Sequence, residues 1–281
     1  MGIEAKNNPK ILFHYTSVGT LLKILDNCVD NKICFKATHA KFFNDPYEYK
    51  LAVSFFKQSM VKYEKENNII NRQSSNFNKN SLLRLGMASG DPFMLSFSEN
   101  SDDLTMWRTY GADGKGVAIG IDREMLDSYS NNENNANTKL LPCQYNKTKI
   151  INRLTKDWKD LYSKVTFMEG GKRLSMSSFR FLFNLIAFSF SFKRNEYSSE
   201  KEWRLCKNEF DQTKIKYREK DGLVIPFVEH YLNKEIVKKI IIGPCVNKKL
   251  TKESIEMLLK SRKYNLQKNS IIISKVPYRQ I

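Results

Sequence analysis

The chain has 281 residues, of which 41% are hydrophobic and 12% aromatic, and this excludes an intrinsically disordered protein. Its formal net charge of +17, from 47 basic and 30 acidic residues, favours an acidic partner such as nucleic acid. Five widely spaced cysteines without a C-x-x-C pair argue against a disulfide framework and a zinc site. No apolar run follows Met1, so we expect no signal peptide and a cytoplasmic location.

The first half of the chain alternates short apolar runs with helical patterns. The runs predict strands at 11–17, 32–38, 91–99 and 117–122. Apolar residues at helical spacing predict helices at 18–25 and 51–63, and a short one that carries Met106. Ser17 is the expected N-cap of the first helix, and Asp102 or Asp103 that of the short one.

The second half begins with a predicted strand at 140–145 and a predicted helical insertion at 146–193. Within the insertion, the apolar segment 179–188 contains Arg180 and Asn184, which favours a buried helix over a membrane span. Further strands are predicted at 197–206, 222–227, 237–243 and 271–275, and a helix at 251–260. We therefore predict the α+β class, with residues 1–281 as one domain around a mixed or antiparallel sheet.

The segment from Tyr197 to Cys206 carries the first candidate site. In an extended segment Glu200 and Glu202 point to the same side, while Trp203 and Leu205 share the opposite, buried side. Two carboxylates aimed at one place are typical of an active-site wall. The alternative is an edge strand with a solvated outer face, on which both carboxylates flank Lys201 and Arg204.

Polar groups at the ends of other predicted strands give further candidates. The sequence contains no phosphate-binding loop, no zinc-protease motif and no nucleophile elbow. Each candidate also has a structural interpretation: His14 as a hydrogen-bonded core histidine, Trp107 and Tyr110 as core residues, and Asp45 as part of a turn. The candidates outside the Glu pair are His14, Tyr15, Thr16, Asn44, Asp45, Ser96, Ser98, Trp107 and Tyr110.

Nearly all of the chain resembles an uncharacterised bacterial domain family of unknown function. The shared motifs are His14-Tyr15-Thr16, Phe43-Asn44-Asp45-Pro46-x-Glu48, Phe97-Ser98-Glu99, Met106-Trp107-x-x-Tyr110, Lys115-Gly116-Val117, Glu200-Lys201-Glu202-Trp203-Arg204 and Pro277-Tyr278-Arg279. This resemblance implies no settled activity.

The order of His14-Tyr15-Thr16, Ser96-Phe97-Ser98 and Glu200-x-Glu202 also resembles the ADP-ribosyltransferase superfamily, which implies a split sheet. The sequence departs from that pattern at Phe97, where the superfamily has threonine, and in the long insert before Glu200.

The second resemblance implies an enzyme that uses NAD as a substrate and needs no metal. Cleavage of the nicotinamide–ribose bond builds an oxocarbenium ion, which a fixed carboxylate stabilises. By this resemblance, Glu202 accepts a hydrogen bond from the nicotinamide-ribose hydroxyl, and Glu200 orients or deprotonates the acceptor substrate. His14 binds the adenosine ribose with Tyr15 and Thr16, Ser96 and Ser98 brace the pocket, and Tyr110 or Trp107 stacks on nicotinamide. Asn44 and Asp45 are further pocket residues, and Arg204 binds the pyrophosphate unless it pairs with Asp45 or Glu48.

Three functional hypotheses follow. The first is an ADP-ribosyltransferase-like toxin or phage-defence effector, with nucleic acid or protein as acceptor, an antitoxin as a further expected partner, and no membrane partner. The second is a non-catalytic binding module that uses the C-terminal segment 231–281, with twelve Lys and Arg residues against three Glu, to hold nucleic acid or protein. The third is a metal-dependent nuclease with carboxylate ligands at Asp45, Glu48, Asp122, Glu200 and Glu202.

Overall fold

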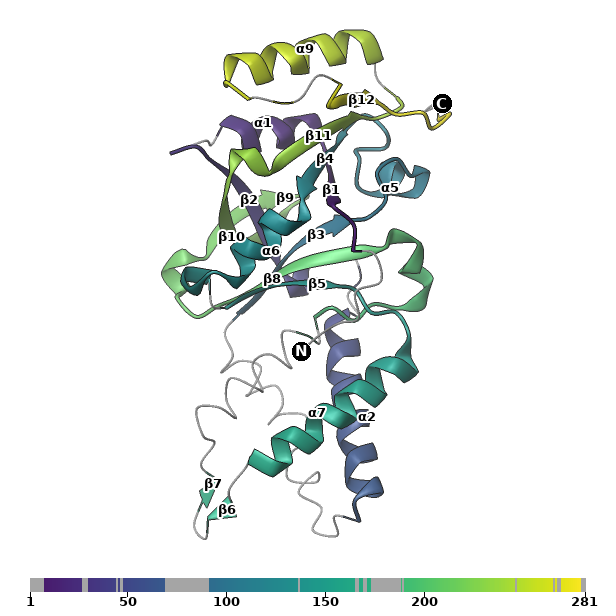
Figure 1. The fold of residues 1–281 in the computed structure, drawn as a ribbon, viewed down its shortest axis with the longest axis vertical. Coiled ribbons are helices and arrows are strands. Elements are labelled where there is room, and N and C mark those ends of the chain that lie inside the picture. Colours follow the sequence, from purple (N-terminus) through teal and green to yellow (C-terminus); the bar gives the residue numbers. More distant parts are fainter. Residues whose placement is uncertain are drawn as a thin grey trace.

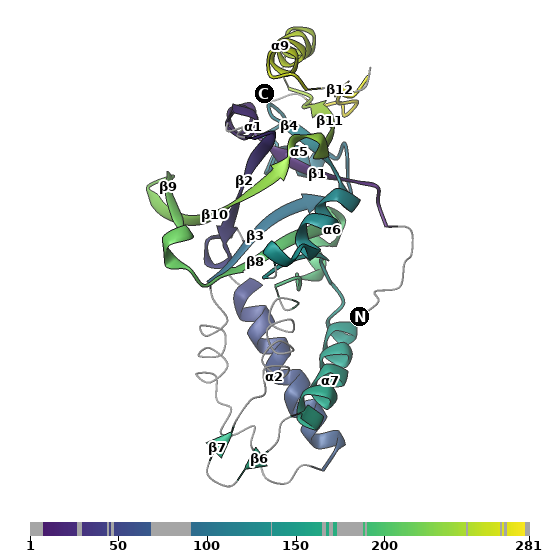
Figure 2. The same ribbon diagram turned by 60° about the vertical axis from the view of Figure 1, so that its left-hand side comes forward.

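The fold was analysed in a computed structural model of the chain (Figure 1, Figure 2). It describes residues 8–26, 30–43, 45, 48–68, 91–135, 137–164, 167–168, 171–172, 188, 190–245, 247–264, 266 and 269–278.

Strands and helices are interspersed along the described residues, as the α+β class requires. The strands are β1 (Ile11–Thr16), β2 (Lys32–His39), β3 (Asp91–Ser98), β4 (Val117–Asp122), β5 (Thr138–Pro142), β6 (Phe167–Met168), β7 (Gly171–Lys172), β8 (Glu202–Glu209), β9 (Lys216–Lys220), β10 (Leu223–Asn233), β11 (Val237–Ile242) and β12 (Ile271–Ile273). The helices are α1 (Val18–Asp26), α2 (Glu48–Glu66), α5 (Leu104–Thr109), α6 (Arg123–Asn131), α7 (Lys147–Lys164) and α9 (Lys248–Ser261), together with the short 3-10 helices η1 (Ala40–Phe42), η2 (Glu133–Asn135), η3 (Asn195–Glu200), η4 (Gln212–Lys214) and η5 (Lys234–Ile236).

The main sheet divides at β3. Along one edge β3 pairs with β8 over its whole length, and β8 pairs in turn with β5. Along the other edge β3 pairs with β1 only at Ser98, and with β2 only at Phe93 and Met94. Two branches leave from these points, β1-β4-β11-β12 and β2-β10-β9. The β11–β12 pair is parallel and the other described pairs are antiparallel, so the sheet is mixed.

One face of the sheet is covered by helices. Leu21 of α1, Leu126 of α6 and Ile255 of α9 are buried against sheet residues such as Phe35 and Leu205. We call this the α1/α6/α9 face. It holds most of the apolar core, and burial of such side chains is the main stabilising contribution to a fold of this size.

The opposite face, which we call the α5 face, has two smaller clusters. Met106 and Trp107 of α5 are buried against Phe13 and Tyr15. Met94 and Cys206 form the second cluster with Ala40 and Phe190. Because strand neighbours in register share a face, the pairs Phe13–Ser98, Ser98–Glu202 and Met94–Cys206 place Glu202 and Arg204 on the α5 face.

Helices α2 and α7 contact each other beyond the end of the sheet opposite α9 (Figure 1). Thr155 of α7 donates to the carbonyl oxygen of Ser59 at 3.5 Å, and Lys62 donates to the Asn152 side chain at 2.6 Å. Helix α7 occupies the start of the predicted insertion at 146–193. Residues 173–187, which include most of the predicted apolar helix at 179–188, lie outside the described residues.

The α+β prediction is confirmed, and the predicted strand at 117–122 coincides with β4. Asp103 caps α5 by accepting from the Met106 N–H, as one of the two predicted alternatives. Helix α6 and strand β9 were not predicted. Among the helices that the structure describes, none combines the length and the apolar character that a membrane span requires.

Candidate active site

The predicted extended path through Glu200 is wrong. Glu200 ends η3, and Lys201 adopts a left-handed conformation with φ of 44° before β8 starts at Glu202. The two carboxylates nevertheless converge. The Lys193 ammonium lies 2.6 Å from Oε2 of Glu200 and 2.7 Å from Oε2 of Glu202. All three side chains are buried, so one cation bridges two carboxylates away from solvent.

Arg204 completes this cluster from the same strand. Its Nε and Nη2 donate to the two oxygens of Glu202 at 2.8 and 3.0 Å, and its Nη1 donates to the Phe190 carbonyl oxygen at 2.8 Å. Arg204 as a whole residue is only 1% exposed. Of its two predicted alternative partners, Asp45 pairs with Arg194 at 3.0 Å. The side chain of Glu48 lies outside the described residues.

The electrostatics keep Glu202 and Lys193 charged. Burial by itself would raise the pKa of Glu202, but Arg204 and Lys193 outweigh burial and lower that pKa to about 2. Burial by itself would lower the pKa of Lys193, but Glu202, together with Tyr110 and Glu200, raises it above its ordinary value. The Glu202 carboxylate and the Lys193 ammonium therefore stabilise each other's charged form near neutral pH.

Three half-buried tyrosines border the cluster. The Tyr110 hydroxyl donates to Oε1 of Glu200 at 3.1 Å, and the Tyr145 hydroxyl accepts from the Glu202 backbone N–H at 2.8 Å. The Tyr197 ring centroid lies 4.8 Å from the Lys193 ammonium. Burial raises the pKa of both Tyr110 and Tyr145, so both hydroxyls stay protonated.

Ser98 positions the first carboxylate through the backbone. Its hydroxyl donates to the Glu200 carbonyl oxygen at 2.6 Å and accepts from the Asn100 N–H at 3.0 Å. In the β3–β8 ladder Ser98 lies opposite Glu202, and Ser96 lies opposite Arg204. The structure therefore brings both predicted serines close to the predicted glutamates.

His14 lies at the division of the sheet, where β1 leaves β3. Its Nδ1 donates to the Ser96 carbonyl oxygen at 2.9 Å, and its ring meets Phe35 and Phe97 edge-on. Both rings belong to the α1/α6/α9 face, and Glu202 belongs to the other face. Burial lowers the pKa of His14, which keeps the imidazole neutral. The structure therefore does not bring His14 together with the carboxylates.

Tyr15 and Trp107 form a structural group beside the cluster. Their ring centroids are 4.8 Å apart, and the Tyr15 hydroxyl donates to the Asn100 carbonyl oxygen at 3.0 Å. The Trp107 indole N–H donates to Asp102 at 2.7 Å. Thr16 is buried at the end of β1. Asn44 lies outside the described residues.

Lys193, Tyr145 and Tyr197 are residues in or beside the cluster that the sequence did not predict as site residues. Lys193 is the last residue of the predicted insertion, and its only sequence signal is a basic residue a few positions before two acidic ones.

The proposed metal ligands whose side chains the structure describes do not form one group. Asp122 caps α6 by accepting from the backbone N–H groups of Glu124 and Met125, and it faces Lys238 at 3.8 Å. Asp45 is paired with Arg194, and the two glutamates with Lys193. Within the described part of the chain, no three His, Cys, Asp or Glu residues are grouped as metal ligands would be.

Comparison with known protein families gives a match over part of the chain. Residues 106–205 match a family described as a protein of unknown function (DUF2971). The matched segment runs from α5 into β8 and contains Tyr110, Lys193, Glu200, Glu202 and Arg204. It supports an uncharacterised domain family. No curated protein and no solved structure matches the chain. The resemblance to ADP-ribosyltransferases has no support from these comparisons and stays a prediction.

Proposed function

We propose that the chain is an NAD-dependent ADP-ribosyltransferase-like enzyme and that the Glu200–Glu202–Lys193 cluster carries its chemistry. The observation that carries the proposal is the convergence of both carboxylates on one buried ammonium, at 2.6 and 2.7 Å. A buried charge is costly unless it is paired and hydrogen-bonded, and the paired carboxylates hold fixed negative charge where water is excluded.

The two carboxylates have different tasks in this proposal. Glu202 receives donors from Arg204 on both oxygens and from Lys193 on one, so it is a fixed charge that positions its neighbours. Glu200 receives one donor on each oxygen, from Tyr110 and from Lys193. A carboxylate has room for about four donors, so Glu200 retains capacity to accept a substrate hydroxyl.

In the proposed reaction the bond between the ribose carbon C1′ and the nicotinamide nitrogen breaks, and nicotinamide leaves with the electron pair. The acceptor atom forms the new bond to C1′ and gives its proton to the Glu200 carboxylate. The half-buried Tyr110 and Tyr197 rings at the border offer aromatic faces for the nicotinamide ring.

The position of Asp122 argues against the nuclease alternative, because Asp122 caps α6 and faces Lys238. The two metal ions of a nuclease site lie about 4 Å apart, which requires their carboxylate ligands to gather.

The test is NAD binding by calorimetry and nicotinamide release by the purified chain, with and without RNA, DNA or cell lysate. Glu200→Gln should abolish release while NAD binding persists. Glu209→Gln is the matched control, because Glu209 is a buried carboxylate at the far end of β8 that pairs with Lys207 at 3.0 Å outside the cluster. Release that survives Glu200→Gln, or absence of NAD binding in the unsubstituted chain, contradicts the proposal.

A further inference from the structure

A cationic surface lies on the α5 face of strands β2, β9 and β10, away from the cluster. We call it the β9 surface, and its residues are Lys36, Lys216, Arg218, Lys220, Phe227 and Tyr231. Register places them on one face: Phe227 lies opposite both Thr38 of β2 and Lys216 of β9, and Thr38 lies opposite Met94. The β9–β10 hairpin stands out from the rest of the molecule (Figure 2).

Two cations of this surface converge on one ring. The Lys36 ammonium is 4.5 Å and the Arg218 guanidinium 5.7 Å from the centroid of Phe227. Arg218 also donates from Nη2 to the Thr38 hydroxyl at 2.8 Å, which fixes the guanidinium plane. The strand pairs and the shared ring therefore hold the two positive charges close together.

Arg218 lacks a carboxylate partner among the described residues, and its Nε is buried without a hydrogen-bond acceptor there. Its Nη2 is held by Thr38, so the guanidinium is oriented without being neutralised by a carboxylate of the described residues. Arginine matches phosphate oxygens through two parallel N–H groups, whereas lysine contributes a point charge.

The same surface exposes an aromatic ring. Tyr231 is 44% exposed, and its hydroxyl donates to Glu229 at 2.7 Å. Lys216 shares that carboxylate at 2.6 Å, and Lys220 is exposed at the end of β9. Four cations against one carboxylate leave the surface strongly positive. Basic residues beside an exposed aromatic ring are typical of proteins that bind single-stranded nucleic acid, since bases stack on the ring and phosphates meet the cations.

We propose that the β9 surface binds single-stranded nucleic acid, with phosphates at Lys36, Arg218, Lys216 and Lys220 and a base on Tyr231. The inference does not depend on NAD chemistry. It differs from the predicted role of segment 231–281 because most of the surface lies before that segment.

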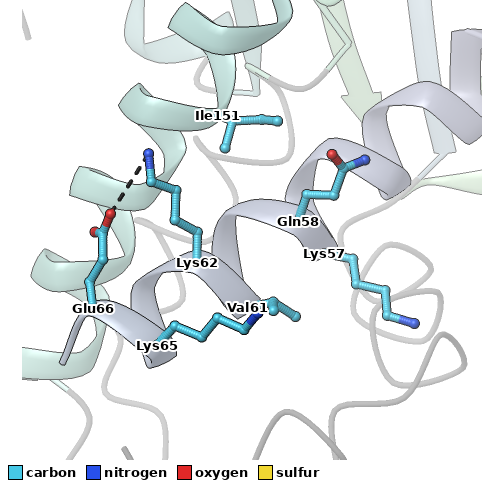
Figure 3. Close-up of a pocket in the computed structure, with 7 residues that line it drawn as sticks. All are labelled: Lys57, Gln58, Val61, Lys62, Lys65, Glu66 and Ile151. Carbon is cyan, nitrogen blue, oxygen red and sulfur yellow. Dashed lines mark ion pairs between the residues drawn. The ribbon is translucent and has the colours of Figure 1, made fainter. Parts of the chain in front are cut away.

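A second cationic region provides a control. The groove between α2 and α7 has a volume of about 630 Å³ and is lined by Lys57, Gln58, Val61, Lys62, Lys65, Glu66 and Ile151 (Figure 3). Its Lys62 is engaged by Asn152 and by Glu66, and none of its described lining residues is aromatic. Among these residues it offers positive charge without a stacking surface.

The experiment measures binding of the full chain, without NAD, to a labelled single-stranded RNA and DNA and to the duplex of the same sequence, between about 50 and 200 mM salt. Single strands should bind more tightly than duplex. The double variant Lys36→Gln/Arg218→Gln should weaken single-strand binding by more than about tenfold. It should also reduce the slope of log affinity against log salt concentration by about one phosphate contact for each charge removed. Tyr231→Leu should weaken binding by about fivefold or more with the salt dependence unchanged.

Two control variants remove equal charge elsewhere, Lys57→Gln/Lys65→Gln in the groove and Lys249→Gln/Lys260→Gln on α9. Both should bind like the unsubstituted chain. Equal losses in a control, equal affinity for duplex, or absence of single-strand binding at low salt overturns the proposal. If Lys36→Gln/Arg218→Gln fails to fold, the double variant Lys216→Gln/Lys220→Gln, at two exposed lysines of the same surface, replaces it. An unchanged salt dependence of binding in that variant also overturns the proposal.

Discussion

Arg204 donates to both carboxylate oxygens of Glu202, two residues earlier on the same strand, at 2.8 and 3.0 Å. Side chains two apart in a strand lie on one face, so the pair needs no contact from another element to form. In the proposed reaction Glu202 is therefore a fixed, positioned charge, and Glu200, held by Lys193 and Tyr110, is the carboxylate that accepts the proton.

Arg204→Met should lower the free energy of unfolding by about 3–5 kcal/mol, because it leaves a buried carboxylate with one cation fewer. The double variant Glu202→Gln/Arg204→Met should regain part of that loss, since both charges are then absent. Urea unfolding followed by tryptophan fluorescence measures both. Arg262→Met, which breaks an exposed pair with Asp26 at 2.7 Å, should cost less than about 1 kcal/mol. Similar losses for Arg204→Met and Arg262→Met would contradict the prediction.

Glu202 should make the protein less stable in acid. Its pKa is about 2 in the folded chain and 4.5 as the ordinary value, so its contribution is fully present above about pH 4.5 and is lost as the pH falls toward 2. The shift corresponds to roughly 3 kcal/mol. The loss of unfolding free energy on acidification should therefore be smaller in Glu202→Gln than in the unsubstituted chain. Parallel curves for the two proteins would show that Glu202 does not titrate this way.

His230 should contribute to stability in its neutral form. It is fully buried, its Nδ1 meets the Tyr129 hydroxyl at 3.1 Å, and burial lowers its pKa from 6.5 to about 3. The unfolded chain then binds one more proton between these values, so stability is present above about pH 6.5 and falls as the pH drops.

The slope of unfolding free energy against pH should be shallower in His230→Gln by up to about 1.4 kcal/mol per pH unit in that window. Unfolding curves at several pH values measure it, and an unchanged slope would contradict the assignment.

Gly116→Ala should destabilise the fold by roughly 1–3 kcal/mol, because overpacking against backbone cannot be relieved by a rotamer change. A Cβ there would lie 2.1 Å from the Thr16 carbonyl oxygen and 2.8 Å from that of Gly111. Gly19→Ala in α1 is the control, since its Cβ meets only Ser17 at 3.9 Å and alanine favours a helix by about 0.5–1 kcal/mol. Thermal unfolding should move in opposite directions for the two variants.

Local features of the fold could be predicted from the sequence because local chemistry specifies them. Apolar runs set strands such as β4, and side-chain oxygens such as those of Ser17 and Asp103 cap the helices that follow. Helix α6 was not predicted, although Asp122 caps it, because Ser, Asp and Asn residues lower its intrinsic helix propensity. Strand β9 has alternating charges and exists through its pairing with β10.

The candidate site was predictable in composition but not in geometry. The Glu-x-Glu spacing indicated two nearby carboxylates, and both are in the cluster. The left-handed turn at Lys201 was not visible, because a lysine in that conformation carries no sequence signature. Lys193 could not be assigned either, since its partners are set by how η3 approaches β8. His14 was predicted on the correct strand. The face of the sheet to which its side chain points, however, depends on where β1 leaves β3.

The central position of β3 also has a consequence for synthesis. Its ladder with β8 joins residues about 100 positions apart, and loop closure of that length is slow. On the ribosome, β3 leaves the exit tunnel long before Glu202–Glu209 is made, so one of its edges has no native neighbour during that interval. That exposed edge makes the nascent chain most prone to aggregation before β8 emerges, and slowing translation just before residue 200 should lower the soluble yield.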